Sequence, residues 1–157
     1  IANTFNMTAT ATSKADNQHL ALTAFANPPS SISIRVSVGG RAPLFSGASG
    51  RVFAAFGDMT EKQIRHNFNQ VNWVEPIAFT KWILQVQEAK HKGYAIDQEE
   101  FMVGVSAIAV PVYSPGNRVF HTIGVLAINP QLKKAKRIEI VNLLKENAEE
   151  ISVNLIR

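Results

Sequence analysis

The stretch VSAIAVPVYSPGNRVFHTIGVLAI, residues 105–128, decides the fold of this chain. Two apolar, β-prone runs, 105–113 and 118–128, are separated by the turn-forming sequence SPGN at 114–117. Two such runs joined by a Pro-Gly turn predict an antiparallel β-hairpin. Because nearly every residue of both runs is apolar, rather than every second one, we expect both faces of this sheet to be covered.

More strands are expected upstream of the hairpin. Residues 3–14 and 18–26 carry β-prone side chains in loose alternation, and KADN, residues 14–17, can close them into a second hairpin. In SISIRVSVGG, residues 31–40, apolar and polar side chains alternate, which predicts a half-buried strand ending at the two glycines. The apolar positions of this strand are Ile32, Ile34, Val36 and Val38.

Two helices are predicted between these strands and the middle of the chain. A short one follows the small-residue loop SGASG, residues 46–50, and ends at Gly57. A second one is expected to begin at Asp58 as N-cap, with Glu61 three residues later, because that spacing is typical of a capping box.

Two further helices flank the apolar hairpin in the sequence. The first covers residues 80–93, with Thr80 as its cap and Gly93 at its end. Its expected inner face is Ile83, Val86 and Ala89. Residues 132–157 form a long amphipathic helix. The residues expected on its inner face are Leu132, Ile138, Val141, Leu144, Ala148 and Ile151.

The predicted order of elements is typical of an α+β domain with an antiparallel sheet: strands come first, then helices, then further strands and a last helix. The 157 residues, 46% hydrophobic and 18% charged, match one domain spanning residues 1–157. No apolar run reaches the ~18 residues that would cross a bilayer, and the absence of cysteine is compatible with a reducing compartment. We therefore expect a soluble, cytoplasmic protein. Since the chain begins at Ile1, we expect it to be a piece of a longer one.

The sequence does not favour an enzyme, a metal site or a cofactor. The histidines lack a second ligand at helical or hairpin spacing; they are His19, His66, His91 and His121. GASG, residues 47–50, loosely resembles a nucleophile elbow, but Arg51 stands where its last glycine belongs. The basic run KKAKR, residues 133–137, is interpreted as a solvated helix face rather than a nucleic-acid patch, because no recognition motif accompanies it.

Two stretches have features of a binding site. The loop SGASG opens a helix, so its free backbone amides can attract a carboxylate or phosphate; equally, its small residues can let the helix pack closely on the sheet. In GYAIDQEE, residues 93–100, Asp97 follows an apolar pair and can cap a loop or accept a hydrogen bond from a ligand hydroxyl. From the residues alone, the cap is the favoured role.

At GYAIDQEEFMVGVSAIAVPV, residues 93–112, the sequence resembles the effector-binding domain of IclR-type bacterial transcriptional regulators. The positions that match the family motif are Gly93, Tyr94, Asp97, Glu100, Gly104, Val105, Ala109, Pro111 and Val112. The segment GGRAPLFSGASGRVFAAF, residues 39–56, is similar to a second family motif, with Arg51 replacing the usual lysine. The matches run in the right order over residues 35–130.

The resemblance implies a GAF-like antiparallel sheet flanked by helices on both faces, and a pocket for a small-molecule effector. It also implies homodimers or tetramers, no membrane contact, and DNA binding only through an N-terminal winged helix-turn-helix domain that this chain lacks. The pocket residues carried over by position are Ala48, Ser49, Asp97, Ala107, Leu126 and Ile128. A GAF-type sensor of another signalling protein, or a small hydrolase, is the alternative.

Three of these pocket positions depart from residues that occur in the family. Ala107 stands where some members have cysteine, and Leu126 and Ile128 stand where serines are common. The loss of two hydroxyl donors favours a more apolar ligand, aromatic or longer-chain. The effector that the resemblance implies is thus a carboxylate or an aromatic or apolar metabolite.

Overall fold

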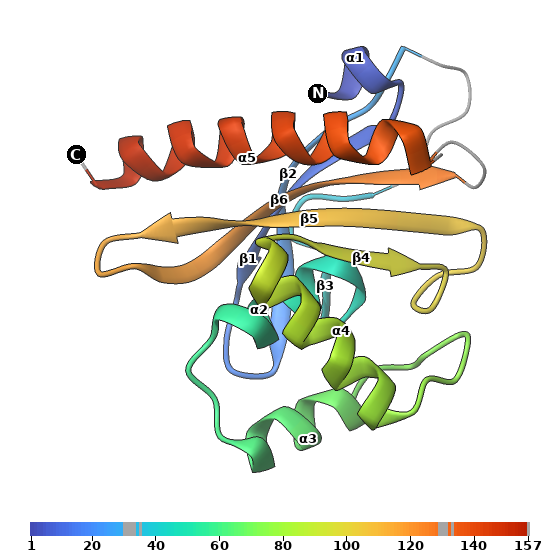
Figure 1. The fold of residues 1–157 in the computed structure, drawn as a ribbon, viewed down its shortest axis with the longest axis vertical. Helices are drawn as coiled ribbons and strands as arrows, with labels where there is room; N and C mark the ends of the chain where they lie inside the picture. The colour runs from blue at the N-terminus through green and yellow to red at the C-terminus, as the bar shows by residue number, and fades with distance from the viewer. Residues whose placement is uncertain (30–33, 35, 129–131, 133, 157) are drawn as a thin grey trace.

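The computed structural model describes residues 1–29, 34, 36–128, 132 and 134–156 (Figure 1). Within them the chain forms five helices and one six-stranded sheet. In chain order, the elements are α1 (Ala2–Phe5), β1 (Thr8–Lys14), β2 (His19–Ala26), β3 (Arg41–Pro43), α2 (Gly47–Phe56), α3 (Glu61–Asn69), α4 (Phe79–Lys92), β4 (Ala95–Gln98), β5 (Val105–Ser114), β6 (Arg118–Ile128) and α5 (Lys134–Ile156).

The strand order in the sheet is β3-β2-β1-β6-β5-β4, and every neighbouring pair is antiparallel. The hairpin predicted over residues 105–128 is confirmed as β5 and β6, in which Ala107 pairs with Leu126 and Ala109 with Gly124. The upstream hairpin is confirmed as β1 and β2. The antiparallel α+β class expected from the element order is therefore correct.

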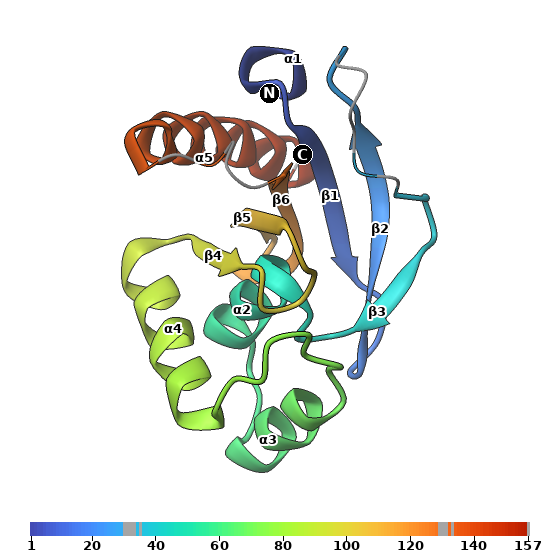
Figure 2. The same cartoon turned by 90° about the vertical axis from the view of Figure 1, so that its right-hand side faces the viewer.

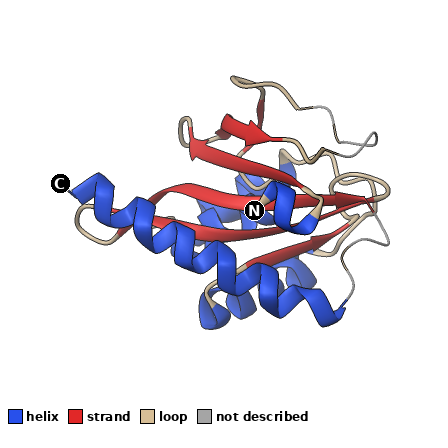
Figure 3. Cartoon of the chain, turned by 90° about the horizontal axis from the view of Figure 1, so that it is seen from above, coloured by secondary structure: helices blue, strands red, loops and turns tan. Residues whose placement is uncertain are grey.

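Helices cover both faces of this sheet. Helix α5 lies across one face, whereas α2, α3 and α4 lie on the other (Figures 1 and 2), and α5 runs over several strands when seen from above (Figure 3). Ile108, Val110 and Val112 of β5 belong to the core under α5, whereas Ala107 and Ala109 belong to the core that includes α2. Because each buried aliphatic side chain stabilises the fold by about 1.5–3 kcal/mol, this double coverage explains the continuous apolar run.

Glycines allow close backbone approach at two places, the start of α2 and the β5–β6 pair. A Cβ on Gly50 would lie 2.0 Å from the backbone carbon of Phe45, and a Cβ on Gly124 would lie 2.3 Å from the carbonyl oxygen of Ile108. Neither position has room for a side chain. Gly50 is therefore required by the close approach of the Phe45 backbone just before α2, and close packing of the SGASG loop on the sheet stays a prediction.

The strand predicted over residues 31–40 is wrong where the structure describes it. Residues 30–33 and 35, including Ile32, lie outside the described residues. Ile34, Val36 and Val38 are not in a strand, and Val38 is 62% exposed. The edge of β2 pairs instead with the following segment: the Gly39 amide donates to the Leu22 carbonyl at 2.8 Å, and β3 continues the pairing.

The predicted ends of several elements also need correction. Residues 3–5 lie in α1, so β1 begins only at Thr8. Helix α3 is capped by Thr60 rather than Asp58, because the Thr60 and Gln63 side chains form a reciprocal capping box. Helix α4 begins at Phe79, one residue before the expected cap. Its end at Gly93 is confirmed, since this glycine is left-handed with φ of 75°.

The buried stripe of α5 differs partly from the predicted one. Val141, Leu144 and Ala148 are buried as expected, and so is Leu132 just before the helix, but Ile138 is 71% and Ile151 38% exposed. Ile140, which was not predicted, is fully buried. None of the helices in the described part of the chain is long and apolar enough to cross a membrane.

Candidate functional site

A cavity of about 260 Å³ lies between the first turn of α2 and the sheet. We call it the α2 cavity. Its walls come from all six strands, the segment before β3, the start of α2 and the loop after β4, and they are mainly apolar. The lining residues with polar side chains are Thr10, Thr12, Ser37, Arg41, Ser46, Ser49 and Asp97.

The structure brings five of the six predicted pocket residues to this cavity: Ala48, Ser49, Asp97, Ala107 and Leu126. The last three form one row across the sheet, because Asp97 pairs with Ala107 and Ala107 pairs with Leu126. Ile128 pairs with Val105 further along β6 and is not one of the lining residues. Side chains distant in sequence therefore meet through strand register.

The start of α2 presents polar groups to the cavity. Ser46 is the N-cap in extended conformation, but its side chain makes no capping hydrogen bond. Its Oγ is buried and has no hydrogen-bond partner among the described residues. The amides of the first turn lack an i−4 carbonyl, as in any α-helix. The Ser49 hydroxyl lies 2.8 Å from Thr122 Oγ1, so Ser49 offers the cavity mainly its amide.

A buried guanidinium holds the acidic side of the cavity in place. Arg51 of α2 is fully buried and donates from Nη1 to Asp97 Oδ1 at 2.9 Å. It also donates from Nη2 to Glu100 Oε2 at 2.6 Å and from Nε to Gln85 Oε1 at 2.9 Å. Gln85 Nε2 in turn donates to Glu100 Oε1 at 2.9 Å. We call Arg51, Gln85, Asp97 and Glu100 the Arg51 cluster.

The charges in this cluster do not balance, because one guanidinium serves two carboxylates. Burial raises the pKa of Asp97 above its ordinary value; Arg51 opposes that rise in pKa, and the nearby Glu100 charge adds to it. The Asp97 Oδ2 atom accepts only a long hydrogen bond, 3.4 Å, from the Phe101 amide. Asp97 therefore fixes the loop after β4, in line with the capping role, and also lines the cavity.

The role of Arg51 was not predicted from the sequence, where this residue was interpreted as breaking the nucleophile-elbow spacing and as replacing the lysine of the family motif. A signal was present in the sequence. Arg51 sits in an apolar helix segment followed by Val52 and Phe53, and a buried arginine needs acidic partners. The planar guanidinium can donate to several acceptors at once in fixed directions, whereas the donors of a lysine ammonium rotate freely.

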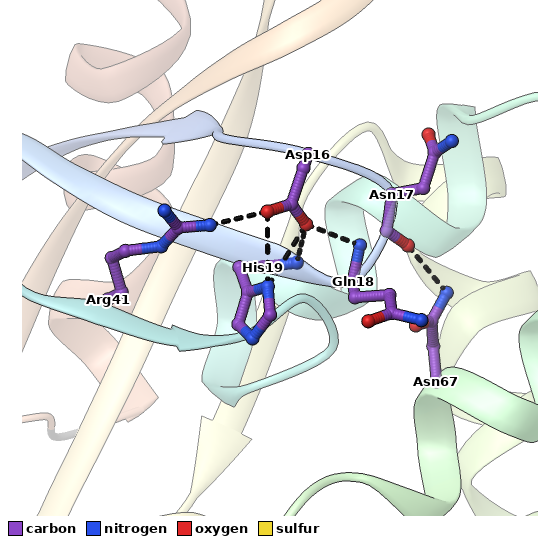
Figure 4. A network of polar contacts seen from close by, with 6 residues as sticks. All are labelled: Asp16, Asn17, Gln18, His19, Arg41 and Asn67. Atoms are coloured by element: carbon purple, nitrogen blue, oxygen red, sulfur yellow. Dashed lines mark hydrogen bonds and ion pairs between the residues drawn. The ribbon is translucent and has the colours of Figure 1, made fainter.

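A second polar network lies in the β1–β2 turn (Figure 4). The Asp16 carboxylate accepts from the amides of Gln18 and His19, at 2.7 and 2.8 Å, and pairs with Arg41. The hydrogen bonds from Gln18, first of all, and from His19 lower the pKa of Asp16 to about 2. Because Arg41 also lines the α2 cavity, Asp16 holds a cation at its wall.

The four histidines do not gather around a common point. His19 contacts Asp16, and His121 Nδ1 lies 2.8 Å from Ser13 Oγ. Within the described residues, no group of three or more His, Asp or Glu side chains is arranged to hold a metal ion.

Comparison with known proteins gives a consistent set of relatives. The DNA-binding transcriptional repressor YiaJ of Escherichia coli (strain K12) is 29% identical over 126 residues, which cover 77% of this chain and 45% of YiaJ. A crystal structure of an IclR transcriptional regulator from Alicyclobacillus acidocaldarius superposes with a TM-score of 0.87 at 28% identity, covering 98% of this chain and 63% of that one. The inducer-binding domain of the transcription factor PobR from Acinetobacter, in a complex of its double mutant with 3-hydroxybenzoic acid, has a TM-score of 0.73 at 20% identity. It covers 96% of this chain and 95% of its own.

The chain spans about half the length of the curated relatives that it matches. The part that it shares with them is defined by the family described as bacterial transcriptional regulator IclR, C-terminal, whose model matches residues 7–153. Motif order, sheet topology and this match agree over nearly the whole chain, which therefore belongs to the IclR family of bacterial transcriptional regulators and corresponds to their C-terminal domain.

Proposed function

We propose that this domain senses a small monoanionic effector with an apolar body, bound in the α2 cavity. The observation that carries the proposal is the Ser46 hydroxyl, which is buried beside the free amides of α2 and has no partner among the described residues. A buried hydroxyl without a partner is costly, and a carboxylate at this helix start would accept from the hydroxyl and the amides together.

The rest of the cavity suits the apolar part of such a ligand. Ala107 and Leu126 leave an apolar wall in the row that begins with Asp97. A single effector hydroxyl could donate to Asp97, whose Oδ2 accepts only one long hydrogen bond. The 3-hydroxybenzoic acid bound by the PobR domain has this combination of carboxylate, hydroxyl and apolar ring.

The regulatory step in this proposal is allosteric. Effector binding shifts the arrangement of paired domains, in a homodimer or tetramer, and thereby the spacing of winged helix-turn-helix domains on an operator. The repressor name of the YiaJ relative supports a DNA-binding partner domain in the parent protein. In this reading the domain binds its ligand without converting it, so it is not an enzyme.

A thermal-shift screen tests the ligand class. Benzoate, 3-hydroxybenzoate and hexanoate should raise the melting temperature, whereas succinate and benzyl alcohol should have little effect. A ligand at 100 times its dissociation constant adds about 2.7 kcal/mol of stability. For a domain of this size, that corresponds to a shift of roughly 5–10 °C.

Calorimetry of a cavity variant then tests the location. Ala107→Phe fills the cavity from β5 and removes no member of the Arg51 cluster, so it should weaken binding of the best ligand at least about tenfold, equivalent to ~1.4 kcal/mol. Ala24→Phe, an exposed position on β2 outside the cavity, is the matched control. Unchanged affinity in a folded Ala107→Phe variant would refute the location, and turnover of the bound ligand would refute the sensor role.

A further inference from the structure

We infer a second binding site, for a small organic molecule with a multiply charged anionic group, at the β4 edge of the sheet. A cavity of about 510 Å³ lies there, between α4, β4 and the first turns of α5. Strand β4 is the last strand of the sheet, and Figure 2 shows it between α5 on one side and α4 on the other. We call this the β4-edge cavity.

Four cationic side chains line this cavity from two helices: Lys81 and Lys92 of α4, and Lys134 and Arg137 of α5. Its two carboxylates already have partners. Glu88 pairs with Lys92, and Glu100 pairs with Arg51 of the Arg51 cluster. Positive charge therefore exceeds negative charge around the cavity. The excess remains when Arg51 and Asp97 of the cluster are counted, because there are then five cationic side chains and three carboxylates, those of Asp97, Glu88 and Glu100.

Three of the four cations are not engaged by the protein. In the described part of the chain, Lys81, Lys134 and Arg137 form no ion pair. The Nε atom of Arg137 is buried and has no hydrogen-bond partner there. A guanidinium presents five donors in a planar fork that matches phosphate and carboxylate oxygens, so an uncommitted Arg137 beside two lysines is suited to a dianion.

The remaining wall is apolar and would contact the organic part of the ligand. Ala89, Ala95 and Ile96 form it, together with Ile138, whose side chain is 71% exposed. This wall also explains an isoleucine that does not fit the buried stripe of α5. A concave, half-apolar cavity favours a small molecule over a nucleic-acid backbone, which needs a long exposed track of cations.

This site is separate from the α2 cavity. The two share no lining residue: Asp97 of the Arg51 cluster lines the α2 cavity, whereas Gln85 and Glu100 of the cluster line the β4-edge cavity. The inference does not rest on the effector proposal, and either site can be filled while the other is empty.

A titration followed by ¹H–¹⁵N NMR tests the inference, with phenyl phosphate as the probe. The amides of Ile96, Gln98 and Ile138 should shift and saturate, while those of Ala48 and Ala107 stay in place. Citrate, as a polycarboxylate, and inorganic phosphate form parallel arms that show which dianionic group is preferred. Benzoate should bind the β4-edge cavity at least about tenfold more weakly than phenyl phosphate, because it carries one charge.

Charge variants of α5 provide the matched comparison. Arg137→Gln should weaken phenyl phosphate binding about tenfold or more. Lys136→Gln removes the same charge from an exposed residue next to it that does not line the cavity, and should change the affinity less than about twofold. Lys81→Gln on α4 should weaken binding as well, which keeps the test valid if the α5 variant folds poorly.

Several results would overturn the inference. The first is the absence of saturable binding by any dianion up to about 10 mM, a concentration at which binding free energies weaker than about −4 kcal/mol are still detected. The second is an equal loss of phenyl phosphate affinity in Arg137→Gln and Lys136→Gln. Shifts confined to the α2 cavity would also overturn it. Short duplex DNA that shifts the same amides more strongly than phenyl phosphate would assign the cations to a nucleic-acid backbone instead.

Discussion

Replacing Arg51 by methionine should destabilise the domain strongly at neutral pH. The substitution keeps an unbranched side chain but removes the guanidinium that donates to Asp97, Glu100 and Gln85. Removing one partner from a buried ion pair costs about 3–5 kcal/mol, because the other charge stays buried and uncompensated. A domain is stable by about 5–15 kcal/mol, so Arg51→Met should remove a large share of that stability.

The loss of stability should depend on pH in a defined direction. Burial raises the folded-state pKa of Asp97 above its ordinary value of 3.8, so the folded protein holds a proton that the unfolded chain releases. Stability from this group therefore falls as pH rises from 3.8 through the raised pKa. Without the opposing Arg51 charge the folded pKa rises further, so the penalty of Arg51→Met should be smaller at about pH 5 than at about pH 7.

Urea unfolding of wild type and Arg51→Met at both pH values measures this penalty. Arg118→Met is the control, since Arg118 is exposed in the β5–β6 hairpin and its loss should change stability by no more than about 0.5 kcal/mol. A loss below about 1 kcal/mol for Arg51→Met would refute the assigned role of the cluster, given the cost of breaking a buried pair. A loss that is equal at the two pH values would refute the electrostatic account.

Two further variants probe the same region. The side chain in Asp97→Asn cannot ionise. Between pH 3.8 and neutrality, the urea midpoint of this variant should therefore decline less steeply with rising pH than that of wild type. Parallel pH profiles of the two proteins would show that the pKa of Asp97 does not change on folding. Gly50→Ala should destabilise the domain by about 1–3 kcal/mol or more in thermal melts followed by circular dichroism, because its Cβ would meet the Phe45 backbone at 2.0 Å. Gly104→Ala has nothing within 4 Å of its Cβ and φ of 71°, so it should cost only about 1 kcal/mol, and equal losses for the two glycines would contradict the packing argument.

The central hairpin and the long helices could be predicted from sequence because each extends over enough residues to show a period. The β5 and β6 runs, Gly93 as the end of α4, and the double coverage of the sheet all follow from local patterns. Strands β3 and β4 are three and four residues long, too short for alternation to be recognised. The residues just before β3 alternate like a strand, yet the edge of β2 pairs with the segment from Gly39 onward.

The SGASG loop and Asp97 were candidates from local pattern, whereas Ala107, Leu126 and Ile128 were predicted only through family resemblance. Asp97, Ala107 and Leu126 meet because of strand register, which links positions up to 29 residues apart in one row. The Arg51 contact with Asp97 spans 46 residues and depends on how α2 packs on the sheet. Which residues pair in this way can be learned only from the tertiary structure. The sequence alone indicates that Arg51 needs an acidic partner, because it is a lone arginine in an apolar helix.

The Arg51 cluster limits how this domain can diversify. Its members form a partition with one cavity on the Asp97 side and another on the side of Gln85 and Glu100, so a substitution in the cluster alters two compartments at once and the stability of the fold. Ala107 and Leu126 line only the α2 cavity and are not members of the cluster. Under the proposed function, a change of side-chain volume at these two positions would alter ligand preference by reshaping one compartment, because neither residue belongs to the cluster.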